Sequence, residues 1–301
     1  MTSKETKIFL IQFGKKWVWI LTIIVILGLI YIGHKAYYKE SVAELIIDDD
    51  QEQLKSNPTR TISPFYEIPF IIQRTGADFN PNLVNDYEKF ESYTISAKKA
   101  AINLGVYAMD IGYLNTYGRT QQALNYMDVC LEMTKTICGQ DVNNFDVLER
   151  FEKNSSNPDS LIQILIQFNI QVITYLDENE HRDFGVLMLA GAFIEALYIT
   201  TQIIDTYPKN LLPNNMRMQV LSPLASILLD QKESLMGLIE LLENVDGKGE
   251  WDILIINDLR KLYYIYDNYP KYKFYPQEPI MDIMIAPLSE QIRKIRADII
   301  S

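Results

Sequence analysis

Few of the residues that reactive sites require occur in this sequence. It has only two histidines, His34 beside an apolar run and His181 in an acidic link, so the spacing of a metal site is absent. It also contains no serine nucleophile motif, no cysteine with a plausible histidine partner and no glycine-rich phosphate loop after a strand. We therefore expect no cofactor and no metal, and we predict that the protein is not an enzyme.

Cysteine is equally scarce, with only Cys130 and Cys138 present. On one continuous helix these two residues lie roughly 12 Å apart, at about 1.5 Å per residue. A disulfide needs Cα atoms within about 7 Å, so a bridge requires a break between the two positions. A helix end at Gly139 leaves a bridge open as an alternative, and two free, buried thiols are the favoured interpretation.

Basic residues are outnumbered, because 28 Lys and Arg face 39 Asp and Glu, for a formal net charge of -11. No basic stripe occurs outside the N-terminus, which argues against a nucleic-acid partner. The 48% hydrophobic content suits a sizeable buried core in one large domain or two small ones.

An uninterrupted apolar run from Trp17 to Gly33 predicts a transmembrane helix, which we place at residues 17–38. Aromatic side chains at its two ends favour the membrane interface, so the expected membrane anchor residues are Trp17, Trp19, Tyr31 and Tyr37. A cleaved signal peptide is the alternative, but the apolar run is longer than the usual stretch of about 7–15 residues.

The lysines before this run outnumber those directly after it, which predicts a cytoplasmic N-terminus at residues 1–16. The rest of the chain then faces the periplasm from the inner membrane. Prolines and the triplet Asp48–Asp50 mark residues 39–82 as a tether and irregular lead-in. A helical domain is expected at residues 83–301.

From Leu83 onward the apolar residues recur at spacings near three, four and seven, which predicts an all-α fold of packed helices. Gly118 and Gly139 divide the first part into a helical hairpin that begins near Leu83. This antiparallel α-hairpin has a weak likeness to a tetratricopeptide unit, but no second copy recurs at the required period of about 34 residues. The expected architecture is a multi-helix bundle of antiparallel α-hairpins behind the single N-terminal transmembrane helix.

Further helices are predicted along the rest of the chain. Asn157 and Pro158 suit the start of a helix that runs to about Glu178. The last helix has a buried stripe that includes Ile292 and Ile299, with Arg293, Lys294 and Arg296 on its solvent side. The other ranges are 145–151, 216–245 with a kink or start at Pro223, and 251–266.

The segment Phe184–Ile204 is long and apolar enough to cross a membrane, yet it carries Glu195 near its middle. A glutamate at the centre of a spanning helix costs several kcal/mol, and the flanks lack aromatic girdles. A core helix surrounded by amphipathic neighbours explains the same composition. We therefore predict that Glu195 is buried among protein side chains.

Two groups of residues are candidate ligand or partner sites. Glu195 and Asp110 are predicted to form a buried acid pair or polar pocket, although a structural role for Glu195 in the core is the favoured alternative. Aromatic rings can stack on sugars or grip a peptide, and packing over the bundle is the favoured alternative for them. The rings in question are Tyr263, Tyr266, Tyr269, Tyr272 and Phe274.

Three strings carry a family resemblance, namely AINLGVYAMD at Ala101–Asp110, LERFEKNSSNPDS at Leu148–Ser160 and AGAFIEALYITTQ at Ala190–Gln202. In this central third, the chain resembles a group of helical envelope lipoproteins of Bacteroidota that have no established activity. The resemblance implies an all-helical domain in the cell envelope. The chain departs from the group because a transmembrane helix replaces the lipidated cysteine.

These observations together predict a membrane-anchored, periplasm-facing helical protein. We expect it to act as an accessory or scaffold subunit of a cell-envelope assembly, with protein partners there. The alternative is a ligand-binding or sensing domain with a pocket near Glu195, Asp110 and the aromatic loop.

Overall fold

The computed structural model describes residues 68–139, 146–245, 247–268 and 280–301, all of which belong to one compact unit, Asn57–Ser301. These residues form α-helices and short 3-10 turns with no strand, so the predicted all-α fold is confirmed for them. The predicted transmembrane helix, with Trp17, Trp19, Tyr31 and Tyr37, lies outside the described residues.

The first half of the domain contains four short elements, followed by three long helices and the short helix α7. The short elements are α3 (Ile68–Thr75), two 3-10 turns at Pro81–Leu83 and Tyr87–Lys89, and α4 (Phe90–Tyr93). The helices that follow are α5 (Ala97–Thr116), α6 (Thr120–Cys138), α7 (Val147–Lys153) and α8 (Pro158–Glu178).

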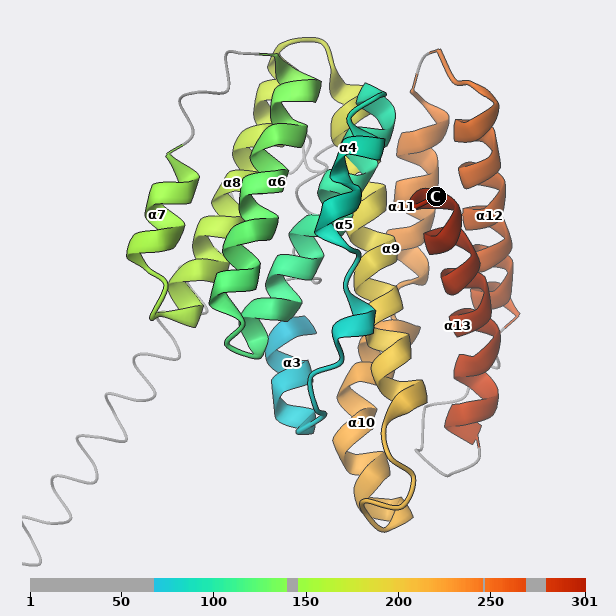
Figure 1. The fold of residues 1–301 in the computed structure, drawn as a ribbon. Coiled ribbons are helices and arrows are strands. Elements are labelled where there is room, and N and C mark those ends of the chain that lie inside the picture. The colour runs from blue at the N-terminus through green and yellow to red at the C-terminus, as the bar shows by residue number, and fades with distance from the viewer. Residues whose placement is uncertain (1–67, 140–145, 246, 269–279) are drawn as a thin grey trace, which may run out of the picture. The chain divides into compact units, whose positions relative to one another are not determined.

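The second half starts with the central helix α9 (Arg182–Thr206). It continues with α10 (Asn214–Leu229), α11 (Lys232–Glu243), α12 (Glu250–Asp267) and α13 (Ile280–Ile299). In Figure 1, α5 and α9 run between α6, α7 and α8 on the left and α11, α12 and α13 on the right.

Helix α9 is the core of this arrangement. It packs against α3, α5, α8, α10, α11 and α13, and these neighbours cover it on all sides. Within its most apolar 18-residue window, 89% of the residues are buried. It is the one helix among the described residues that is long and apolar enough to span a membrane, and it lies inside the protein. The prediction that Phe184–Ile204 is a core helix is confirmed.

Two glycines allow α5 and α9 to pack with their backbones in contact. A Cβ atom on Gly105 would lie 1.9 Å from the carbonyl oxygen of Met188, and one on Gly191 would lie 1.8 Å from that of Ile102. Atoms cannot approach so closely without displacing one of the helices. The two pairs of positions run in opposite directions along the chain, so the helices are antiparallel.

Several predicted helix ends are confirmed. Gly118 and Gly139 follow α5 and α6 with φ angles of 64° and 77°, values that favour glycine. At the start of α8, the Asn157 side chain accepts a hydrogen bond from the Ser160 N–H at 3.2 Å, and Pro158 occupies the first turn. This cap satisfies one of the free N–H groups of the helix.

Other boundaries differ from the prediction. Residues 68–75, which we assigned to the irregular lead-in, form α3 with Ile68 and Ile72 buried. The first long helix begins at Ala97 rather than near Leu83, and Ile95 before it is 80% exposed. The helix predicted at residues 216–245 is two helices, α10 and α11, separated at Asp230 and Gln231.

Candidate functional site

Asp110 of α5 and Glu195 of α9, which the sequence paired, lie together in the interior, and Arg296 of α13 joins them. The side chain of Glu195 is 0% exposed and that of Arg296 is 9% exposed, while Asp110 is 0% exposed. The carboxyl groups of Asp110 and Glu195 are within hydrogen-bonding reach of each other. We call these three residues the charge trio.

Arg296 binds Glu195 through two parallel hydrogen bonds. Its Nε donates to Oε2 at 2.6 Å, and its Nη2 donates to Oε1 at 2.8 Å. The guanidinium carbon also lies 4.0 Å from the centre of the Tyr198 ring. This forked geometry is the strongest form of arginine–carboxylate pairing, and it fixes the orientation of the guanidinium group.

The prediction that Arg296 faces solvent is wrong. Ile292, Arg296 and Ile299 follow one another at spacings of four and three, so Arg296 lies within the buried stripe of α13. Its neighbours Arg293 and Lys294 are exposed, as predicted. Sequence reasoning missed Arg296 because a charged residue was assigned to the surface by type, although its spacing indicated the core.

The charge trio contains two acids but only one cation, so the pKa values of the two acids are shifted to different extents. Burial raises the pKa of Asp110 well above its ordinary value of 3.8, and the negative charge of Glu195 raises it further. Burial also raises the pKa of Glu195, but the charge of Arg296 opposes this effect. Asp110 therefore has the more strongly raised pKa of the two acids, and in its protonated form it can donate a hydrogen bond to the Glu195 carboxylate.

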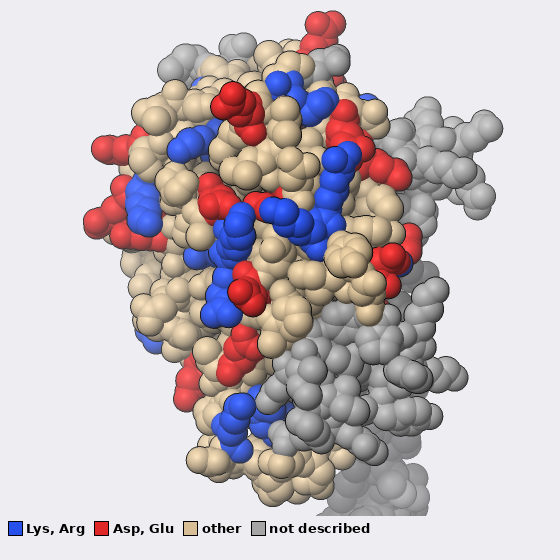
Figure 2. Space-filling view, turned by 90° about the vertical axis from the view of Figure 1, so that its right-hand side faces the viewer, with Lys and Arg blue, Asp and Glu red and all other residues tan. Residues whose placement is uncertain are grey.

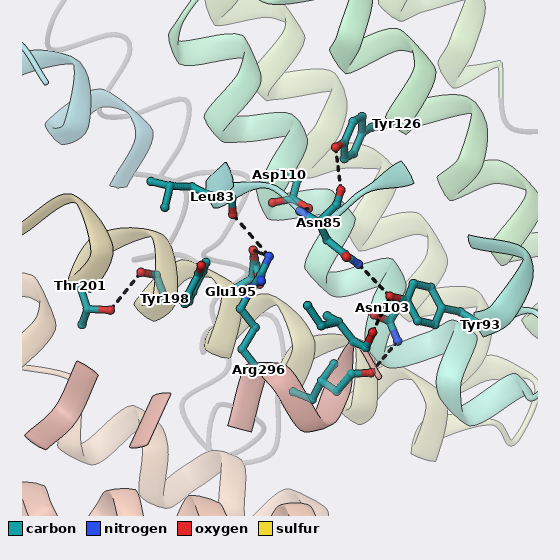
Figure 3. A network of polar contacts seen from close by, with 12 residues as sticks. Leu83, Asn85, Tyr93, Asn103, Asp110, Tyr126, Glu195, Tyr198, Thr201 and Arg296 are labelled. Carbon is teal, nitrogen blue, oxygen red and sulfur yellow. Dashed lines mark hydrogen bonds and ion pairs between the residues drawn. The ribbon is translucent and has the colours of Figure 1, made fainter. Parts of the chain in front are cut away.

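The charge trio holds a segment of the protein's own chain, residues 83–86, which we call the strap (Figure 3). The strap starts at Leu83, the last residue of the first 3-10 turn, and ends directly before the second. The Asn85 N–H donates to Asp110 Oδ2 at 3.0 Å, and Arg296 Nη2 donates to the Leu83 carbonyl oxygen at 3.4 Å. Two of the three charged residues thus bond directly to strap backbone.

Three tyrosines complete the binding of the strap. Tyr126 Oη donates to the Asn85 carbonyl oxygen at 2.6 Å, and Tyr107 Oη donates to that of Asp86 at 2.7 Å. The Asn85 side chain donates to Tyr93 Oη at 3.2 Å. Because buried backbone groups must find partners, these side chains replace the hydrogen bonds that a sheet or helix would supply.

Another buried acid, Asp258 of α12, has two partners whose side chains reach the surface. Its side chain is 0% exposed and bridges Lys261 Nζ at 2.7 Å and Lys294 Nζ at 2.5 Å. Burial alone would raise the pKa of Asp258, but the two lysines together hold it below its ordinary value. These three residues form the lysine bridge.

A cavity of about 580 Å³ opens beside the strap. Its walls come from the strap, the two flanking 3-10 turns, the ends of α5 and α6, and the end of α13. Polar and charged lining residues are Asn82, Asn85, Asp86, Lys89, Gln122 and Arg296. Aromatic lining residues are Phe79, Tyr87 and Tyr126.

The predicted aromatic group does not border this cavity where the structure describes it. Tyr266 is buried and its hydroxyl donates to the Leu228 carbonyl oxygen at 2.8 Å. Tyr263 is half-buried, with Lys232 Nζ 5.3 Å from its ring centre. Tyr269, Tyr272 and Phe274 lie outside the described residues. The aromatic rings that border the cavity are Phe79, Tyr87 and Tyr126, and the sequence did not predict them as site residues.

The remaining reactive groups are separated from one another. Cys130 is buried and Cys138 is half-buried on α6, and both are free, as the favoured interpretation predicted. Burial raises the pKa of Cys138 to about 11. Among the described residues, no group of three or more His, Cys, Asp or Glu side chains is placed to hold a metal ion.

Comparison with known proteins returns no matching family model, no matching curated protein and no matching solved structure. The resemblance to envelope lipoproteins therefore stays a prediction.

Proposed function

We propose that the helical domain acts by binding, as an accessory or scaffold subunit of a cell-envelope assembly, held at the inner membrane by the N-terminal helix. The charge trio supports a role in binding rather than catalysis, because Asp110 and Arg296 are committed to the strap. The membrane anchor, the periplasmic location and the tetratricopeptide-like character of the α5–α6 hairpin are parts of this proposal that rest on the sequence.

The observation that carries the partner role is a set of three exposed apolar side chains on α12. Ile253, Leu254 and Tyr264 are 50%, 46% and 68% exposed. Positions 253 and 264 are three helical turns apart and therefore share one face. Figure 2 looks onto the side of the molecule that carries α12 and α13, where charges of both signs lie among uncharged surface. An apolar patch rimmed by polar side chains marks a protein interaction site, and we propose that these three side chains belong to one.

Site-specific photocrosslinking in native membranes tests this proposal. A photoreactive residue at Tyr264 is expected to capture an envelope protein, and Ile253→Glu is expected to abolish the adduct. The matched control places the same group at Gln171, an exposed position on α8. Equal adducts at both positions, or an adduct that survives Ile253→Glu, would contradict the role of α12.

The second candidate function is a ligand-binding or sensing domain, and the cavity beside the strap favours it. Its volume lies within the range of about 300–1,000 Å³ that small-molecule sites occupy. The proposed pocket is therefore placed at the strap, on the side of Tyr87 and Tyr126, rather than at the aromatic loop.

A further inference from the structure

We propose that the cavity beside the strap is a saccharide-binding site. The inference rests on the ligand-binding proposal and deepens it by naming the class of ligand. It depends on three properties of the cavity: fixed aromatic rings, unoccupied polar side chains that both donate and accept, and little net charge.

The aromatic walls are held in place by the protein itself. The rings of Tyr87 and Tyr126 are 5.5 Å apart and inclined at 54°, and the Tyr126 hydroxyl is bonded to the strap. Phe79 is fixed by Arg119, whose guanidinium carbon lies 4.7 Å from the ring centre. A sugar ring presents C–H groups on its faces, and such apolar faces pack well on rigid aromatic rings. Half-buried Tyr87 is the ring of this wall most open to such a contact, because Tyr126 is only 5% exposed.

The polar walls offer both donors and acceptors. The side chains of Asn82, Lys89 and Gln122 make no hydrogen bond to any other described residue. Asp86 uses Oδ1 to accept the Glu88 N–H at 3.0 Å and keeps Oδ2 for a ligand. Sugar hydroxyls donate and accept at once, so they match a wall of amides and one carboxylate.

The charge of the cavity disfavours strongly anionic ligands. Arg296 at its inner end is neutralised by the two hydrogen bonds to Glu195. Lys89 and Asp86 carry opposite charges on the same wall. Phosphate ligands are favoured by clustered positive charge, whereas an uncharged polyhydroxyl ligand does not need it.

The cavity is also formed before a ligand arrives. Tyr107, Tyr126 and Asp110 hold the strap backbone, and Glu195 with Tyr198 holds the Arg296 guanidinium. A site whose walls are fixed by buried hydrogen bonds loses little conformational entropy when it binds.

The test uses full-length protein in lipid nanodiscs prepared without glycoside detergents, because sugar-bearing detergents would occupy the site. Binding is screened on a glycan array and on an array of short peptides, and hits are titrated by calorimetry. At least one glycan is expected to bind. Because a neutral hydrogen bond or a ring contact contributes about 0.5–1.5 kcal/mol, Gln122→Ala and Tyr87→Ala should each raise Kd roughly two- to tenfold.

The control variant is Gln121→Ala, which alters the exposed neighbour of Gln122 outside the cavity and should leave Kd unchanged. A glycan that binds equally to the Gln121 and Gln122 variants would overturn the assignment of the site. Peptide binding that depends on Gln122, without glycan binding, would overturn the saccharide inference and leave the ligand-binding function standing. If neither a glycan nor a peptide binds, both the saccharide inference and the ligand-binding function are overturned.

Discussion

The charge trio and the lysine bridge each contain a fully buried carboxylate, Glu195 and Asp258, and they treat it in opposite ways. The partner of Glu195 is 9% exposed and a second acid shares it, whereas Asp258 has two lysine partners whose side chains are 62% and 50% exposed. Accordingly, the pKa values of Asp110 and Glu195 are raised and that of Asp258 is lowered. Whether the pKa of a buried acid is raised or lowered therefore depends on the ratio of acids to cations in the cluster and on the access of water to the cations.

The helices that carry these clusters also pack differently. α5 and α9 meet through Gly105 and Gly191, with no space for a Cβ atom. Helix α13 packs against α9 and α12 through large side chains instead, and Leu288, Ile292 and Ile295 are all buried. Asp110 and Glu195 lie on this close pair of helices, whereas Asp258 and Lys294 of the lysine bridge lie on α12 and α13.

The largest expected effect follows the removal of the arginine in the charge trio. Arg296→Met leaves the Glu195 carboxylate without its cation and removes the hydrogen bond from Arg296 to the Leu83 carbonyl oxygen. Breaking a buried ion pair lowers the free energy of unfolding by about 3–5 kcal/mol. Urea-induced unfolding should show this loss. The matched control is Arg293→Met on the same helix, where the exposed side chain donates to the Ser289 carbonyl oxygen. Equal losses in both variants would contradict the account.

The close contact of α5 and α9 is tested by a methyl group. Gly191→Ala would place Cβ against the Ile102 carbonyl oxygen, and overpacking of this kind costs about 1–3 kcal/mol or more. Gly237→Ala in α11 is the control, because no atom lies within 4 Å of its added Cβ. The free energy of unfolding of that variant should rise by roughly 0.5–1 kcal/mol, because alanine favours a helix more than glycine does. Thermal unfolding that ranks the two variants in the reverse order would refute the glycine contact.

The protonation of Asp110 predicts a slope of stability with pH. The folded protein holds a proton that the unfolded chain releases above pH 3.8, the ordinary pKa of the group. The free energy of unfolding should therefore fall as pH rises from this value through the raised pKa. Asp110→Asn keeps an acceptor for the Asn85 N–H and a donor for Glu195, so it should flatten this part of the curve. A slope that is unchanged in the variant would show that Asp110 does not carry the proton.

At the lysine bridge, the free energy of unfolding should change with pH in the opposite direction. The expected change in stability is also the smallest of those predicted. The lowered pKa of Asp258 contributes stability above its ordinary value of 3.8, and this contribution is lost as pH falls through the folded-state pKa. Because both lysines are at least half exposed, Asp258→Asn should cost about 1 kcal/mol or less at neutral pH. Unfolding curves at pH 3 to 7 would check both the sign and the size.

The sequence predicted the elements with regular spacing and missed those built from long-range contacts. The core position of α9 and the meeting of Asp110 with Glu195 followed from apolar context, and the cap at Asn157 followed from local chemistry. The strap has no such signature, because its hydrogen bonds come from residues far along the chain, such as Tyr126 and Arg296.

The misplaced helix ends have a related cause. The apolar stripe of α10 continues into α11 through Leu228 and Leu235, both buried, so periodicity does not reveal the turn between them. Likewise, Tyr87 and Phe90 stand at helical spacing before α5, but they belong to a 3-10 turn and to α4. In each case, tertiary contacts preserve the pattern while the backbone breaks.

Hydrogen exchange of the Asn85 amide tests most directly whether the buried acids hold the chain's own strap. This amide should be protected in the wild type, where it donates to Asp110 Oδ2 at 3.0 Å. Protection should persist in Asp110→Asn, which keeps an acceptor oxygen, and should be lost in Asp110→Ala. If the amide exchanges rapidly in the wild type, or stays protected in the alanine variant, the acid pair has another role.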